Sequence, residues 1–315
     1  MKKTILVTGG AGFIGINFLE LMTAKYPDYR FVCYDKLTYA ANVDKLTELE
    51  KADNLSFVKG DICDEKAVDE LFSSVQPDIV INFAAESHVD RSIESSDIFL
   101  KTNVLGVRVL LDACRKYGTA RFHQISTDEV YGEVPSGSDR VCDEASPLNP
   151  GSPYSVSKAA ADMLVMSYHR TYNLPVSISR SSNNYGKYQH PEKLIPLMVK
   201  RAVNNQPMPV YGNGENIRDW LSVTDHCRAI DMIIHRGRTG EIYNICADNP
   251  VSNFEMVRFI CRCLSKPESL ITYVEDRKGH DFSYRTTCNK LKTELCWSPL
   301  SDFEKELKCA IDSFM

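Results

Sequence analysis

Short apolar runs alternate with longer amphipathic segments along the first half of the chain. Five of these runs are rich in β-branched and aromatic residues and are predicted as buried strands: Thr4–Val7, Phe31–Tyr34, Leu55–Val58, Ile79–Phe83 and Phe122–Ser126. In the intervening segments apolar residues recur at helical spacing, which predicts helices over Phe13–Ala24, Glu65–Ser74, Phe99–Tyr117 and Tyr154–Tyr172. Strands that alternate with helices build βαβ units, so we expect an α/β fold with a doubly wound parallel sheet of Rossmann type.

The pattern becomes less regular after Ser179. Prolines and a Gly-Asn-Gly turn divide the next stretch into short pieces at Pro191, Pro196, Pro207, Pro209 and Gly212–Gly214. A further helix is expected near Thr224–His235, and Glu241–Ile245 could be a strand that returns to the main sheet. We therefore expect a Rossmann-type domain over residues 1–180 and a smaller C-terminal lobe over residues 181–315.

Composition and charge narrow the classes of function. The chain has 315 residues and a formal net charge of −5, which does not favour non-specific binding to the many phosphates of a nucleic acid. No apolar run approaches the roughly 18 residues that a membrane span needs. The apolar stretch after Lys2 and Lys3 is only Ile5–Val7, too short for a signal peptide. We expect a cytoplasmic protein with no nucleic-acid or membrane partner.

The 11 cysteines occur at irregular spacings. Cys261 and Cys263 are the nearest pair, and no C-x-x-C motif is present. This pattern matches neither a zinc site nor a disulfide scaffold, so we expect reduced thiols and no bound metal.

A glycine-rich turn follows the first predicted strand. Thr8–Gly15 reads T-G-G-A-G-F-I-G and opens the first helix, a context in which backbone N–H groups bind a pyrophosphate. Asp35 ends the second strand, about 20 residues beyond Gly15, where a carboxylate binds the ribose hydroxyls of NAD and repels the 2′-phosphate of NADP. An isolated Asp would more often be a turn residue, but the glycine loop favours an NAD site. Asp61 either reaches the adenine or is a plain turn residue.

Tyr154 and Lys158 stand four residues apart on a predicted helix, so both side chains lie on one face. A nearby ammonium favours the phenolate and lowers the pKa of the tyrosine, which makes it a usable base toward a hydroxyl group. A lone Tyr-x-x-x-Lys is more often a surface pair. Here it is joined by Ser126–Gly132, with the sequence S-T-D-E-V-Y-G, at the strand edge where a doubly wound sheet binds its ligand.

Together these motifs resemble the extended short-chain dehydrogenase/reductases. Several segments resemble the dTDP-glucose 4,6-dehydratase family in particular: Asp35–Tyr39, Ala84–Asp90, Ser126–Gly132, Ser182–Gly186, Pro191–Pro196 and Arg218–Trp220. The resemblance extends from Lys3 to about Trp297. Its most specific part is Thr-Asp-Glu at 127–129, because related epimerases usually carry small or hydroxyl residues at Asp128 and Glu129, whereas nucleotide-sugar decarboxylases and GDP-mannose dehydratases typically have Thr-Ser-Glu.

The resemblance implies an NAD-dependent hydro-lyase whose substrate is dTDP-glucose. Oxidation of C4 acidifies the proton on C5, and loss of water across C5 and C6 then needs a base and an acid. The family pattern gives the base role to Glu129 and the acid role to Asp128, which would be protonated in the resting enzyme. Thr127 would hydrogen-bond O4 beside Tyr154, with Lys158 as the partner of the tyrosine.

The resemblance also implies the binding contacts. NAD would contact Gly9, Gly12, Phe13, Ile14, Gly15, Asp35, Lys36, Leu37, Thr38, Asp61, Ile62, Ala84, Ala85, Ser87, Thr102, Tyr154, Lys158 and Asn184. The nucleotide sugar would contact His88, Thr127, Asn183, Lys193, Leu194, Ile195, Pro196, Pro209, Tyr211, Arg218, Asn253, Arg277 and His280. Residues 1–180 would then bind NAD and carry the catalytic groups, and residues 181–315 would mainly bind substrate. Arg218 and Arg277 would donate hydrogen bonds to the phosphate oxygens of the substrate.

The chain departs from the family pattern around the substrate lobe. Cys246 and Ala247 stand where glycines are usual, Phe282 where a basic residue is usual, and Ala41 where glycine is common. The loop between Tyr131 and Tyr154 is also shorter than is usual in the family. These departures leave open whether the nucleotide is dTDP, UDP or CDP.

Two other functions and one assembly question stay open. An epimerase or decarboxylase would share the first oxidation, and a non-catalytic dinucleotide-sensing regulator would need the glycine loop alone. The apolar faces of Phe99–Tyr117 and Tyr154–Tyr172 either form the four-helix contact of a homodimer or cover the sheet.

Overall fold

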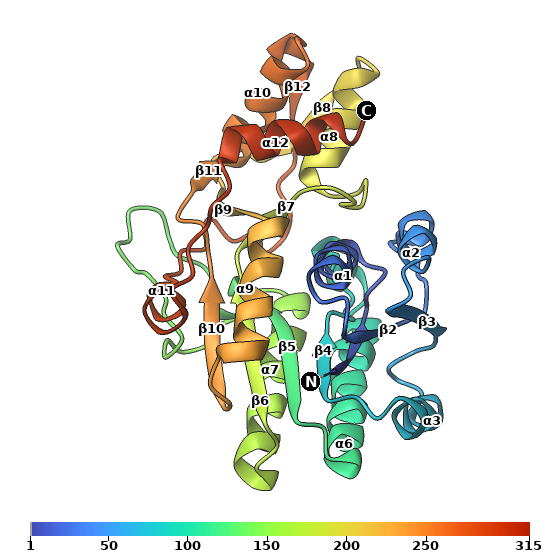
Figure 1. Ribbon diagram of the computed structural model, residues 1–315. Helices are drawn as coiled ribbons and strands as arrows, with labels where there is room; N and C mark the ends of the chain where they lie inside the picture. Colours follow the sequence, from blue (N-terminus) through green and yellow to red (C-terminus); the bar gives the residue numbers. More distant parts are fainter. Residues whose placement is uncertain (1) are drawn as a thin grey trace.

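A seven-stranded parallel sheet forms the centre of the fold (Figure 1). The computed structural model describes residues 2–315. The strands, in the order β10-β6-β5-β4-β1-β2-β3, are β1 (Thr4–Thr8), β2 (Arg30–Asp35), β3 (Leu55–Lys59), β4 (Ile79–Asn82), β5 (Arg121–Thr127), β6 (Val176–Ser181) and β10 (Glu241–Ile245). Every neighbouring pair is parallel, which confirms the predicted fold class. The strand order reverses between β1 and β4, and strand ends at such a switch point border a ligand crevice.

Helices cover both faces of this sheet (Figure 1). One face carries α1 (Phe13–Lys25), α2 (Val43–Leu49), α9 (Val223–Arg236) and α11 (Asn289–Leu295), and the other carries α3 (Glu65–Val75), α6 (Val107–Tyr117) and α7 (Pro153–Tyr172). In β1, Ile5 and Val7 belong to the core of the first face and Leu6 to the core of the second, and all three are buried. Burial on both faces explains why the strands are continuous apolar runs in the sequence.

The segment Glu241–Ile245 returns to the main sheet. As β10 it pairs with β6, with Tyr243 opposite Ser179, and forms one edge of the sheet. The preceding helix α9 packs on α1. The seventh strand of the main sheet therefore comes from the C-terminal part of the chain, well after the sixth strand, β6.

The predicted helix over Phe99–Tyr117 is a composite element. It begins with α5 (Asp97–Leu100), continues through the π-helical segment η1 (Lys101–Gly106) and ends as α6; the short α4 (Val89–Glu94) precedes it. The π-helical turn lets buried Asn103 bond the loop after β4, since its Nδ2 donates to the oxygen of Glu86 at 3.0 Å and its Oδ1 accepts from the nitrogen of Glu86 at 2.8 Å. Such bulges often occur at functional sites.

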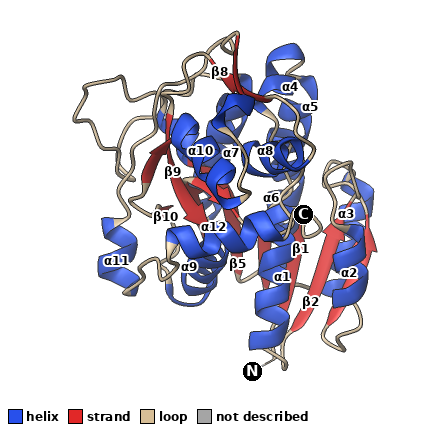
Figure 2. Cartoon of the chain, turned by 90° about the horizontal axis from the view of Figure 1, so that it is seen from above, coloured by secondary structure: helices blue, strands red, loops and turns tan. Residues whose placement is uncertain are grey.

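A second lobe lies above the C-terminal ends of the main strands (Figures 1 and 2). It contains β7 (Asn183–Tyr185), β8 (Met208–Tyr211), β9 (Ile217–Ser222), β11 (Pro250–Ser252) and β12 (Ile271–Val274), with α8 (Leu194–Val203), α10 (Asn253–Cys263), η3 (Glu268–Leu270) and α12 (Phe303–Asp312). The lobe has its own apolar core around Met198, Val257 and Leu307. None of the helices in residues 2–315 combines the length and hydropathy that a bilayer-spanning segment requires.

Candidate active site

A cavity of about 590 Å³ lies where the main sheet meets the second lobe, a size typical of small-molecule sites. The five predicted catalytic residues line it, as do all the predicted cofactor residues except Leu37 and all the predicted substrate residues except Ile195 and Pro196. Leu37 instead packs against the main apolar core. Successive residues of a helix point about 100° apart, so Leu194 faces the cavity while Ile195 and Pro196 are buried in α8.

The glycine loop has the geometry that a pyrophosphate requires. Gly9 has a φ of 69°, and a Cβ there would lie 2.3 Å from the backbone nitrogen of Ala84. A Cβ at Gly15 would lie 2.4 Å from the carbonyl oxygen of Gly9. The N-cap of α1 is Gly12, which has no capping side chain, and the first turn of the helix has no acidic residue. The N–H groups of this turn can therefore bind an anion.

Asp35 is held at the end of β2 by its own loop. Its carboxylate accepts hydrogen bonds from the backbone nitrogens of Ala11 at 3.1 Å and Leu37 at 2.8 Å. Burial raises the pKa of Asp35, and the two backbone donors oppose that effect. Each carboxylate oxygen keeps a second lone pair for a ribose hydroxyl. The glycine loop and this carboxylate together fit an NAD molecule.

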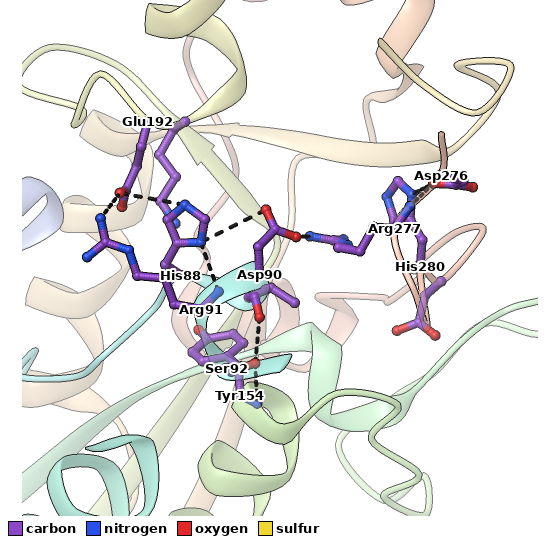
Figure 3. A network of polar contacts seen from close by, with 12 residues as sticks. His88, Asp90, Arg91, Ser92, Tyr154, Glu192, Asp276, Arg277 and His280 are labelled. Atoms are coloured by element: carbon purple, nitrogen blue, oxygen red, sulfur yellow. Dashed lines mark hydrogen bonds and ion pairs between the residues drawn. The ribbon is translucent and has the colours of Figure 1, made fainter. Parts of the chain in front are cut away.

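Local sequence fixes the start of the catalytic helix α7. The side chain of Ser152 accepts a hydrogen bond from the nitrogen of Ser155, and the two residues form a reciprocal capping box. The backbone nitrogen of Tyr154 donates to Ser92 Oγ of α4 at 3.2 Å (Figure 3). This contact holds the first turn of α7 against α4, and Tyr154 lines the cavity from that turn.

The expected lowering of the Tyr154 pKa is wrong for this structure. Burial raises the pKa of Tyr154, and the nearby carboxyl groups of Glu129 and Asp128 raise it further. Lys158 donates from Nζ to the carbonyl oxygen of Ile125 at 2.6 Å, and burial lowers the pKa of this lysine to about 8. Desolvation and the acidic neighbours therefore outweigh the lysine one turn away.

The two acidic residues lie in a short turn directly after β5. This 3₁₀ turn, η2 (Asp128–Tyr131), is capped by Thr127, whose Oγ1 accepts from the nitrogen of Glu129 and donates to Asp128 Oδ1, both at 3.3 Å. Asp128 is only 2% exposed. The strand end therefore delivers a hydroxyl and two carboxyl groups to the same part of the cavity.

The two carboxyl groups differ in their electrostatic surroundings. Burial, followed by the charge of Glu129, raises the pKa of Asp128 well above its usual range. Burial also raises the pKa of Glu129, but the cations of Arg218, Arg277 and Lys193 oppose this. These surroundings favour the protonated form of Asp128 more than that of Glu129, the order that an acid at position 128 and a base at position 129 would need.

Arg218 is fixed in place by backbone oxygens. It lies on β9 and is 6% exposed, and its guanidinium donates to the carbonyls of Ile217 at 2.7 Å, Phe282 at 3.1 Å and Asp281 at 3.0 Å. The ring of Tyr284 lies 4.7 Å below it. A guanidinium held in this way is preorganised for phosphate oxygens.

Arg277 and His280 reach the cavity from the loop after β12 (Figure 3). Arg277 lies 3.5 Å from Asp90 through one terminal nitrogen, while its buried Nε has no hydrogen-bond partner among residues 2–315. His280 Nδ1 lies 2.6 Å from Asp276 Oδ1. An unpartnered guanidinium N–H at a cavity wall is suited to a diphosphate.

Glu192 connects the loop after β4 with the loop before α8 (Figure 3). Its Oε2 lies 3.6 Å from His88 Nε2 and 3.2 Å from a terminal nitrogen of Arg91. The adjacent Lys193 donates from Nζ to the oxygen of Ser87 at 3.0 Å. The predicted substrate contacts His88 and Lys193 are therefore brought together from opposite lobes.

Several cavity residues were not predicted from the sequence. Tyr284 is the clearest, since its hydroxyl donates to Asp281 Oδ2 at 2.6 Å and its ring supports Arg218; Trp220, Gln189 and Met198 also line the cavity. Tyr284 stands four residues after His280, the last predicted substrate contact in the sequence, and this proximity was the only available signal. Within residues 2–315, no group of three or more His, Cys, Asp or Glu side chains is placed to hold a metal.

The parallel sheet, the glycine loop with Asp35 and the Tyr154–Lys158 pair define the class as an NAD-dependent short-chain dehydrogenase/reductase. The family model described as GDP-mannose 4,6 dehydratase matches residues 6–309. The dTDP-glucose 4,6-dehydratase of Haemophilus influenzae is 46% identical, covering 99% of this chain and 97% of its own. The chain belongs to the dTDP-glucose 4,6-dehydratase family, and it is an NAD-dependent hydro-lyase.

Solved structures agree with this assignment. DesIV, the dTDP-glucose 4,6-dehydratase of Streptomyces venezuelae with NAD and dTDP bound, has a TM-score of 0.94 at 42% identity and covers 99% of this chain and 96% of its own. The UDP-glucose 4-epimerase of Thermotoga maritima has a TM-score of 0.91 at 28% identity, covering 99% and 98%. The epimerase shares the fold at much lower identity.

Proposed function

We propose that this chain converts dTDP-glucose into dTDP-4-keto-6-deoxyglucose and water. The proposal rests on one observation: buried Asp128 and its neighbour Glu129 share a cavity with Tyr154 and Lys158. A simple dehydrogenase has no use for two adjacent carboxyl groups, whereas an elimination needs both an acid and a base. The names of the relatives support the same substrate.

The first step is oxidation at C4 of the glucose. Tyr154 Oη accepts the proton of the C4 hydroxyl, and Thr127 Oγ1 hydrogen-bonds O4 and orients it. Lys158 supplies the positive charge that favours the tyrosine phenolate. When bound, NAD would accept a hydride from C4, return it to C6 after the elimination, and favour the phenolate through its positive ring.

The second step is loss of water across C5 and C6. Glu129 removes the C5 proton that the C4 ketone has acidified, and Asp128 gives its proton to the departing C6 hydroxyl, which leaves as water. Glu129 then returns its proton to C5 when C6 is reduced. A proton passes from Tyr154 to Asp128, so the site is reset with every atom accounted for.

The second lobe would hold the nucleotide. Arg218 and Arg277 would bind the diphosphate, and Asn183 and Lys193 would contact the sugar side. The remaining contacts expected for substrate are His88, Leu194, Pro209, Tyr211, Asn253 and His280. We therefore assign residues 1–180 mainly to NAD and catalysis, and residues 181–315 mainly to substrate, apart from the segments that complete the main sheet.

We also infer a homodimer and a cytoplasmic location. The outer faces of α7 and of the composite helix expose apolar side chains, among them Leu100, Leu105, Val156 and Met163, the last at 67%. A two-fold contact would bury these side chains. All eleven cysteines are free thiols, which suits a reducing compartment. Light scattering of the wild type and of Met163→Glu tests the dimer: the wild type should have twice the monomer mass, and the variant should dissociate.

Product analysis tests the proposed reaction. The purified protein is incubated separately with dTDP-glucose, UDP-glucose and CDP-glucose, and the products are identified by mass spectrometry. We expect loss of one water from dTDP-glucose, with no net change in NAD. An isomer of unchanged mass would indicate an epimerase, and NADH formed in proportion to product would indicate an ordinary dehydrogenase.

A further inference from the structure

The two halves of the catalytic centre come from different elements. Tyr154 and Lys158 lie on α7, whereas Asp128 and Glu129 lie on η2. Both pairs must reach the same sugar ring, so the distance between these elements has to be fixed. Outside the cavity, a chain of buried polar side chains connects the two elements.

Arg180 is the centre of that chain. It lies on β6, is 3% exposed, and donates from Nε to Asp162 Oδ2 of α7 at 2.9 Å. A terminal nitrogen of the same guanidinium donates to Tyr131 Oη at 2.9 Å, and the guanidinium lies 4.9 Å from the tyrosine ring. Tyr131 Oη in turn donates to Asn244 Oδ1 of β10 at 2.8 Å. One planar side chain thus contacts the catalytic helix and the acidic turn at once.

These residues are positioned to connect the catalytic helix α7 with the acidic turn η2. Arg180 is paired with Ser126 of β5 in the sheet, immediately before the strand end that carries the acidic turn. Tyr131 is the last residue of that turn. Asp162 lies one helical turn beyond Lys158 on α7, and it is 1% exposed. None of Arg180, Asp162 and Tyr131 lines the cavity, so none of them is placed to touch the substrate or the cofactor.

We propose that Arg180 is a positioning residue that fixes the spacing between the oxidising pair on α7 and the acid–base pair on η2. This role rests on the proposed dehydratase function. The guanidinium fork is rigid and holds two partners in fixed directions. A displacement of about 1 Å in a reacting group can cost on the order of 100-fold in rate, so a loose turn would impair elimination while the helix still supports oxidation.

The first test is Tyr131→Phe, which keeps the ring and removes the hydroxyl that Arg180 contacts. Tyr243→Phe is the matched control, because Tyr243 of β10 is likewise a buried tyrosine whose hydroxyl bonds a charged side chain, here Glu294 at 3.1 Å, and it does not line the cavity. We expect Tyr131→Phe to lower kcat about tenfold or more and to accumulate enzyme-bound NADH during turnover. Tyr243→Phe should match the wild type in both respects.

Hydrogen–deuterium exchange gives a readout that does not depend on turnover. In Tyr131→Phe the backbone amides of residues 127–132 should exchange faster than in the wild type, and in Tyr243→Phe they should not. Arg180→Lys keeps the charge beside Asp162 but lacks the fork, so it should show the NADH accumulation of Tyr131→Phe. If Arg180→Lys does not fold, Tyr131→Phe alone decides the matter.

The outcomes separate this inference from the proposed function. A wild-type protein that forms no keto-deoxy product overturns the proposed function and the positioning role together. An active wild type with Tyr131→Phe indistinguishable from Tyr243→Phe, in kcat, NADH level and amide exchange, overturns the positioning role alone.

Discussion

Replacing Glu129 with Gln should block elimination and leave oxidation possible. Glutamine keeps the size of the side chain and can still hydrogen-bond, so the packing of the turn should be preserved. General base groups typically contribute 10²–10⁴-fold, which corresponds to about 3–5 kcal/mol of barrier. The charges of Arg218, Arg277 and Lys193 favour the ionised form of this carboxyl, and replacing it with Gln removes a negative charge that opposes an anionic substrate. The loss should therefore appear in kcat, with KM unchanged or lower.

The assay follows two signals in a single turnover. Enzyme-bound NADH is measured by its near-ultraviolet absorbance, and the product by mass spectrometry. Glu129→Gln should accumulate NADH without matching product and should not incorporate solvent deuterium at C5. Glu133→Gln is the control, because Glu133 lies just beyond the turn and bonds the nitrogen of Phe282 at 2.8 Å without lining the cavity. A loss of less than about tenfold in Glu129→Gln would show that another group removes the C5 proton.

Four further predictions address the other groups. Tyr154→Phe lacks the base for O4, so NADH and product should both fall at least about 100-fold; rapid NADH formation would assign the oxidation to another base. Asp35→Ala should narrow the preference for NAD over NADP, measured as a ratio of Kd values, and tighter NADP binding by the unmodified protein would contradict the role of Asp35. Asp128→Asn should slow elimination yet raise the free energy of unfolding by about 0.5–2 kcal/mol at neutral pH. The reason is that burial and Glu129 raise the pKa of Asp128 in the folded state, so the wild type loses stability as the pH rises above the pKa of this carboxyl in the unfolded chain. Asn does not titrate, so the advantage of Asp128→Asn should disappear in acid. A lower Tm than that of the wild type at neutral pH would refute this. Because the pKa of Lys158 is lowered to about 8, kcat should fall as the pH rises through that value, and a flat alkaline profile would mean that its charge is not needed.

The parallel sheet could be predicted because its strands and helices are signalled by local patterns. Buried runs such as Ile5–Val7 allow few alternatives, and the composition of Glu241–Ile245 already suggested a returning strand. The π-helical segment at Lys101–Gly106 could not be predicted, because its apolar spacing is that of an ordinary helix. The small sheets of the second lobe pair strands far apart in sequence, such as β8 with β12, and no local pattern specifies such pairings.

Site residues could be predicted where they belong to a short sequence motif. Properties that depend on which residues fold around a side chain could not be predicted. Thr127, Asp128 and Glu129 stand in one short segment at a strand end, so both their identity and their place could be inferred. The raised pKa of Tyr154 could not, since it depends on burial and on carboxyl groups from another element. Arg180 looks like any strand residue in the sequence, and its importance depends on partners brought together only by folding.

The placement of the oxidising pair on α7 and of the acid–base pair on the turn η2 has an evolutionary consequence. The epimerase of Thermotoga maritima has the same fold at 28% identity, and epimerases usually lack the acid pair. Substitutions at positions 128 and 129 would therefore alter the second step of the reaction, while the glycine loop, Asp35 and the Tyr154–Lys158 pair lie in other elements and keep their places. Selection for a different sugar reaction would then act on a few codons in the turn after β5, and duplicated copies of one ancestral NAD-dependent enzyme would diversify on the same scaffold.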